Sequence, residues 1–157
     1  MIGHEEIYKE NTMKLASKSI RVLLIVLNIF LALTAFGGGI QLLVGFYIPP
    51  VEMLNGSPFK DFTIPGLALG IIVGGSALFA AILWIRKSKF AIPASVAAGL
   101  VIMFFEFVEA LIIGSPAGPA RFMQILYFGM GTMIASVALG QWFFESLSTS
   151  SMQQTAK

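Results

Sequence analysis

Apolar residues dominate four long stretches of the chain, and short polar segments separate these stretches. The apolar runs cover about residues 22–46, 64–85, 90–113 and 120–144. A helix that crosses a membrane needs about 20 mostly apolar residues, because the hydrocarbon core is about 30 Å thick and a helix rises about 1.5 Å per residue. Each run meets this length. We therefore predict an all-α fold, a bundle of four transmembrane helices that forms a single membrane domain over residues 1–157.

The composition fits a chain that is embedded in a bilayer. Hydrophobic residues make up 57% of the 157 residues and charged residues 11%, whereas soluble domains carry about 25% charged residues. The absence of cysteine excludes disulfides, thiolate catalysis and iron–sulfur clusters. Because no predicted span contains a histidine either, we expect no metal site, no catalytic residues and no cofactor. The net charge of +2 is too small to indicate nucleic-acid binding, so the expected surroundings are the lipid bilayer.

The basic residues are divided unequally between the two ends of the predicted bundle. Eight of the ten lie before the first span, between the second and third, or after the fourth: Lys9, Lys14, Lys18, Arg21, Arg86, Lys87, Lys89 and Lys157. Only Lys60 and Arg121 lie at the other end. Since cytoplasmic flanks are enriched in Lys and Arg, we predict a multi-pass protein of the plasma (inner) membrane with both termini cytoplasmic. Trp84 and Trp142 fall at the same inner interface, where an aromatic belt is expected.

Small residues recur every four positions in the last three predicted spans. Lipid tails are as apolar as leucine, so membrane helices associate through close packing of small residues. The predicted packing positions are Gly66, Gly70 and Gly74 in the second span, Ser95 and Gly99 in the third, and Ser136 and Gly140 in the fourth. These faces pack within the bundle or against another subunit, and the spacing does not decide between the two. Three consecutive glycines at 37–39 in the first span permit a kink, a close crossing or a local unwinding.

The connection between the first two spans is the only long one. Residues 47–66 combine two adjacent prolines and the turn sequence Asn55-Gly56-Ser57-Pro58 with several large apolar side chains. A free linker would be less apolar, so we predict a structured outer loop that covers the outer end of the bundle. The residues before the first span are predicted to form a short cytoplasmic segment.

Two carboxylates, Glu106 and Glu109, interrupt the third apolar run. They are three residues apart and share a helix face, and they lie about 10 Å and about 6 Å from the outer end of the span. Acidic side chains inside a membrane face the bundle interior and pair with polar groups. The candidate binding cluster at this depth consists of Glu106, Glu109, Arg121, Gln124, Tyr127 and Gln41. We expect Glu109 to be ionised and paired with Arg121, and the deeper Glu106 to hold its proton.

Three functions are compatible with such a cluster. The first is a non-enzymatic accessory or scaffold subunit, or a small binding protein with an outward-facing polar pocket. The second is a proton- or cation-coupled transporter or channel that acts as an oligomer. The third is a membrane enzyme acting on a lipid-phase substrate, which paired carboxylates can support. We predict the first, with a homo-oligomer or a partner membrane subunit as its assembly.

Three segments carry a resemblance to a known group of proteins. "GSPFKDFTIPG", "VGGSALFAAI" and "FEFVEALIIG" resemble segments of an uncharacterised family of small four-span integral membrane proteins in bacteria. The resemblance covers about residues 55–113. It implies the four-span fold and attaches no activity, ligand or partner.

Overall fold

The protein is built from helices joined by short connections. A computed structural model describes the backbone of residues 2–46 and 48–155, and the side chains of residues 8, 11–46 and 48–146. In chain order, the elements are α1 (Ile2–Val44), the 3₁₀ helix η1 (Val51–Leu54), α2 (Thr63–Leu67), the π-helix η2 (Ala68–Gly74), α3 (Gly75–Ile85), α4 (Ala91–Ile113) and α5 (Pro119–Thr155). No strand occurs among these described residues, which confirms the all-α prediction.

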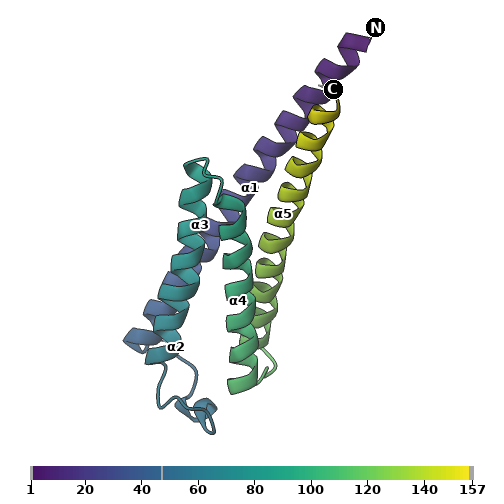
Figure 1. The fold of residues 1–157 in the computed structure, drawn as a ribbon. Coiled ribbons are helices and arrows are strands. Elements are labelled where there is room, and N and C mark those ends of the chain that lie inside the picture. Colours follow the sequence, from purple (N-terminus) through teal and green to yellow (C-terminus); the bar gives the residue numbers. More distant parts are fainter. Residues whose placement is uncertain (1, 47, 156–157) are drawn as a thin grey trace.

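Four helical segments are long and apolar enough to cross a membrane: Asn11–Val44, Thr63–Ile85, Ala91–Ile113 and Pro119–Ser146. Each overlaps one of the four predicted spans, so the chain has the architecture of a multi-pass membrane protein. Helices α1 and α5 continue beyond the predicted spans (Figure 1). They do so because neither glycine nor proline occurs in residues 4–36 or in residues 141–157, so no strong helix breaker ends them.

The two ends of the bundle differ in what they contain (Figure 1). The terminal end has both chain termini and the turn of residues 86–90. The loop end has residues 48–62, which include η1, and the turn of residues 114–118. In the predicted topology, the terminal end is cytoplasmic and the loop end faces outward.

The second span changes its backbone hydrogen bonding along its length. Helix α2 has Pro65 in its first turn, where a missing N–H breaks no helical hydrogen bond. Over η2 the backbone N–H groups donate to carbonyl oxygens five residues earlier, as in the short π-helical segments that occur inside α-helices. In α3 the hydrogen bonds again join residues four apart. Gly70, Gly74 and Gly75 lie in or directly after η2, and glycine readily adopts backbone geometry that departs from the α-helix.

Glycines bring α1 directly against the second span. A Cβ added to Gly39 would lie 2.8 Å from the carbonyl oxygen of Gly66 and 2.9 Å from backbone atoms of Gly70. Gly74, one turn further along, faces the ring of Phe36 on α1. The three second-span glycines thus lie beside α1, and the triple glycine of α1 provides a close crossing while the helix itself continues uninterrupted.

A second glycine contact joins α4 to α5. A Cβ added to Gly99 would lie 2.6 Å from the carbonyl oxygen of Gly131, and the reverse distance is also 2.6 Å. The buried Ala135 extends this face of α5 by one turn. Ser136 and Gly140 instead lie exposed on α5, so the face that packs against α4 is displaced by one residue from the predicted one.

Buried polar side chains connect three helices in the terminal half. The Nδ2 group of Asn28 on α1 donates to the Oγ atom of Ser95 on α4 at 3.1 Å. The indole Nε1 of Trp84 on α3 donates to the same oxygen at 2.8 Å. Trp84 is only 6% exposed, so the prediction that it belongs to an interfacial aromatic belt is wrong. A tryptophan at the end of a span can point toward lipid or toward the bundle interior. The Trp84 side chain points inward, where its indole N–H donates to Ser95.

The helices separate toward the loop end. Helix α4 packs along α5 and α3, whereas no Cα atom of α4 comes within 8 Å of one in α2. Figure 1 shows the second span and α4 leaving the turn of residues 86–90 together and diverging with distance from it. The short helix η1 contacts α4 across the resulting space.

We expect Gly131→Ala to lower the thermal unfolding temperature in detergent, because the added methyl would meet the Gly99 carbonyl at 2.6 Å. Gly140→Ala is the matched control, since no atom lies within 4 Å of its added methyl. It should leave the unfolding temperature unchanged or raise it, because alanine favours a helix over glycine by about 1 kcal/mol. Gly39→Ala and Gly37→Ala form an equivalent pair on α1. Equal unfolding temperatures within each pair would show that close crossings do not hold the helices together.

Candidate functional site

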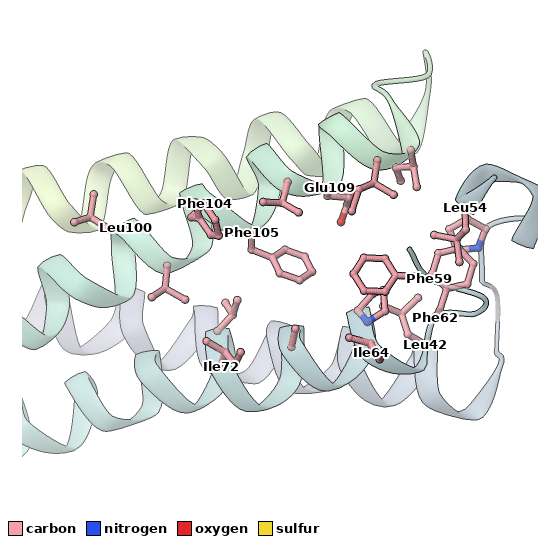
Figure 2. Close-up of a pocket in the computed structure, with 18 residues that line it drawn as sticks. Leu42, Leu54, Phe59, Phe62, Ile64, Ile72, Leu100, Phe104, Phe105 and Glu109 are labelled. Carbon is pink, nitrogen blue, oxygen red and sulfur yellow. The ribbon is translucent and has the colours of Figure 1, made fainter. Parts of the chain in front are cut away.

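A pocket lies between the second span and α4 in the loop-end half of the protein. Its volume is about 560 Å³, which is within the range of small-molecule sites. Every side chain that lines it is apolar except that of Glu109. Figure 2 shows the Glu109 carboxyl directed from α4 into this space, on the side facing Phe59.

One face of α4 forms a wall of the pocket. The lining positions occur as neighbouring pairs four residues apart, at 100–101, 104–105, 108–109 and 112–113. This spacing follows one side of an α-helix. Glu109 therefore occupies a position in an otherwise continuous apolar row that includes Phe104 and Phe105.

The loop of residues 48–62 closes the pocket at the loop end. Leu54 and Phe62 are buried there, and Phe59 and Phe62 both contribute to the lining (Figure 2). The loop turns into α2 at Asp61, whose Oδ1 accepts the Thr63 backbone N–H at 2.9 Å. This backbone hydrogen bond and a second from the Thr63 side chain hold the pKa of the Asp61 carboxyl below its usual range.

The pocket is not fully enclosed. Four of its lining residues have large exposed fractions: Ile64 60%, Ile72 58%, Leu100 54% and Phe104 68%. All four belong to helices that are apolar enough to span a membrane. In a bilayer, this opening therefore faces the hydrocarbon of the lipid.

Glu109 has a polar partner on α5. The Nε2 group of Gln124 donates to its Oε1 atom at 3.2 Å and to the carbonyl oxygen of Gly114 at 3.1 Å. Gln124 is buried, and its own Oε1 atom has no hydrogen-bond partner among the described residues. The structure therefore brings together two of the six predicted cluster residues at the pocket wall.

Glu106 points in a different direction from Glu109. It is 6% exposed and does not line the pocket. It follows Gly99 by seven residues and Ile102 by four, which places it on the helix face that packs against α5. In the described part of the chain its carboxyl makes no hydrogen bond. Whether it holds its proton stays a prediction.

The other three predicted cluster residues lie elsewhere. Arg121 is exposed, and its Nε and Nη2 groups donate to the carbonyl oxygen of Ser115 at 2.9 and 2.5 Å. Within residues 48–146 no ion pair joins it to Glu109, so Arg121 closes the α4–α5 turn instead of neutralising the carboxylate. Tyr127 is half-buried against the apolar core, and Gln41 is exposed on α1.

Sequence reasoning identified Glu109 but not the aromatic residues around it. Phe59 and Phe62 were expected only as part of a covering loop, and Phe104 and Phe105 only as part of a span. An apolar residue on a membrane helix can face lipid, protein or a pocket, so its apolar character does not predict which of these it contacts. The usable signal is the combination of a carboxylate with aromatic residues four and five positions earlier, on the same helix face.

No group of three His, Cys, Asp or Glu side chains that could hold a metal ion occurs among the described residues. Comparison of the chain with protein-family models, curated proteins and solved structures found no match. The resemblance to four-span bacterial proteins therefore gains no support from these comparisons, and the site must be interpreted from its own chemistry.

We expect Gln124→Met to destabilise the protein in detergent by about 1 kcal/mol, the scale of a hydrogen bond between membrane helices. The substitution keeps the length of the side chain but removes the donor to Glu109 and Gly114. Tyr127→Phe is the control, because no hydrogen bond of Tyr127 occurs in the described structure. Chemical unfolding of both variants measures the difference, and equal free energies of unfolding would assign no stabilising role to the Gln124 contacts.

Proposed function

We propose that the protein is a non-enzymatic membrane protein that binds an amphiphilic ligand from the bilayer, in the pocket beside Glu109. The observation that carries this proposal is an apolar cavity of about 560 Å³ with a single carboxylate in its lining. Ligand sites commonly combine apolar walls with a few polar groups that fix orientation. The exposed lining residues on two membrane-spanning segments provide a route of entry from the lipid.

The position of Glu109 indicates the polar group that such a ligand carries. An ionised carboxylate only accepts hydrogen bonds, and Arg121 makes its contacts at Ser115. A hydroxyl or ammonium group would therefore be favoured at Glu109, whereas a second carboxylate would be repelled. The apolar part of the ligand would extend along Phe105 and Phe104 toward Leu100.

This proposal narrows the function predicted from the sequence. The sequence predicted an outward-facing polar pocket, whereas the proposed site is an apolar pocket with one polar group. The difference arises because Glu106 faces α5 and Arg121 faces the turn of residues 114–118. Transport by an oligomer and chemistry on a lipid substrate have no comparable observation in their favour. Association with a second copy or a partner subunit stays a prediction.

We expect oleylamine to raise the thermal unfolding temperature of the purified protein in detergent more than oleic acid does, because only the amine complements a carboxylate. Glu109→Gln should weaken the binding of oleylamine by roughly tenfold, since it replaces a charged acceptor by a neutral group. Glu106→Gln is the matched control, because Glu106 does not line the pocket. Equal loss in both variants would contradict a specific role of Glu109.

A second pair of variants tests the pocket itself. Ala68→Phe places a ring in the lining and should abolish binding of oleylamine, whereas Ala97→Phe makes the same change at an exposed position of α4 outside the lining. Full binding by folded Ala68→Phe would show that the amine binds elsewhere.

We also propose that the terminal end is cytoplasmic. The support is the concentration of basic residues there, of which Arg21, Arg86, Lys87 and Lys89 border the predicted spans. The side chains of Lys9 and Lys157 lie outside the described residues. Because Trp84 is buried, the proposal depends on charge alone.

Single cysteines at two exposed asparagines of this cysteine-free chain test the orientation. We expect Asn55→Cys, at the loop end, to react with a membrane-impermeant maleimide in intact cells. Asn11→Cys, at the terminal end, should react only after lysis. The opposite pattern would invert the proposed topology.

A further inference from the structure

A second pocket lies at the terminal end, where α1, α5 and the turn of residues 86–90 meet. It has a volume of about 320 Å³. In contrast to the apolar pocket, its lining is rich in polar and charged side chains: Ser17, Arg21, Lys87, Ser88, Lys89, Gln141 and Glu145. Three of these are basic and one is acidic, so the lining carries an excess of positive charge.

Arg21 is fixed in position at this pocket. Its Nε group donates to the carbonyl oxygen of Trp84 at 3.1 Å, and its Nη2 group donates to that of Ile85 at 3.2 Å. These contacts hold the guanidinium at the end of α3 and use two of its five N–H donors. Lys87 and Lys89 follow in the exposed turn directly after α3, and Lys89 Nζ lies 5.2 Å from the centre of the Phe90 ring.

The beginning of α4 adds further positive potential. Ala91 and Ile92, the first two residues of this 23-residue helix, line the pocket. No side chain caps the helix at Phe90. The Ala91 N–H donates to the Ser88 carbonyl oxygen and Pro93 has no N–H, so the helix dipole is the main source of attraction for an anion here. A helix start and three cations thus converge on one cavity.

A buried acceptor in the lining gives an independent indication of a ligand. Gln141 is 1% exposed, and its Nε2 group donates to Ser17 Oγ at 2.9 Å and to Glu145 Oε1 at 2.7 Å. Its Oε1 atom has no hydrogen-bond partner among the described residues. This oxygen needs a donor, which an alcohol hydroxyl on a group esterified to a phosphate can supply.

We propose that this pocket binds the head group of an anionic phospholipid, with the phosphate at Arg21, Lys87 and Lys89 and a head-group hydroxyl at Gln141. The level of the pocket favours a lipid over free phosphate as the source. Lys87 and Lys89 lie between the ends of two membrane spans, and Phe90 and Trp142 near the same level are 59% and 57% exposed. Basic and aromatic residues of this kind lie at the head-group level of a bilayer.

Native mass spectrometry of the full chain in detergent tests the proposal, with phosphatidylglycerol as probe and phosphatidylcholine as the comparison lipid. Phosphatidylglycerol carries a net charge and free hydroxyls, whereas phosphatidylcholine has neither. We expect the protein to retain phosphatidylglycerol at least tenfold more strongly. Lys87→Gln with Lys89→Gln should reduce this retention by roughly tenfold, since each lysine near a membrane surface contributes several-fold to the binding of anionic lipid.

The double variant Lys18→Gln with Arg86→Gln is the matched control. It removes the same charge from exposed residues of the same end that do not line the pocket, and it should retain the lipid within about twofold. Equal losses in the two double variants would reduce the effect to general surface charge and overturn the proposal. Displacement of phosphatidylglycerol by millimolar inorganic phosphate would also overturn it, because the pocket would then be a site for free phosphate. Unchanged retention in the presence of phosphate supports the lipid.

Discussion

Direct backbone contact between glycines determines how the four spans are arranged. Gly39 meets Gly66 and Gly70, and Gly99 meets Gly131, at distances that leave no room for a side chain. In lipid, where apolar surface gains little from association, such close approach is a main source of packing energy. The chain therefore contains two helix pairs joined through glycine contacts, α1 with the second span and α4 with α5, and α3 and α4 pack the two pairs together in the terminal half.

Hydrogen bonds between the two pairs occur mainly at one end of the protein. In the terminal half, Ser95 on α4 accepts hydrogen bonds from Asn28 on α1 and Trp84 on α3, and Gln141 on α5 donates to Ser17 on α1. At the loop end, the polar contact of Gln124 with Glu109 lies within one pair, between α5 and α4. The pairs are thus fastened together at the terminal end and separated at the other by the apolar pocket, which the loop residues Phe59 and Phe62 close.

The number of the spans could be predicted because it depends on length and composition, which are properties of the sequence itself. The face that a helix presents to its neighbours was harder to predict. In α5, the small residues at 131 and 135 and those at 132 and 136 have the same spacing, and only the partner helix selects the first set. Glu109 and Gln124 were found because polar groups in a membrane need partners. The predicted ion pair between Glu109 and Arg121 does not form among the described residues, because the Arg121 guanidinium donates to the carbonyl oxygen of Ser115 in the adjacent turn.

The lateral opening of the apolar pocket has a thermodynamic consequence for anything that enters it. An alkyl chain that moves from the bilayer into the pocket exchanges one hydrocarbon environment for another, so the hydrophobic effect contributes little to the transfer. Discrimination against bulk lipid then depends on the fit to the aromatic walls and on the carboxylate of Glu109. Occupancy accordingly follows the mole fraction of a ligand among the surrounding lipids, and its concentration in water matters only through partition into the membrane.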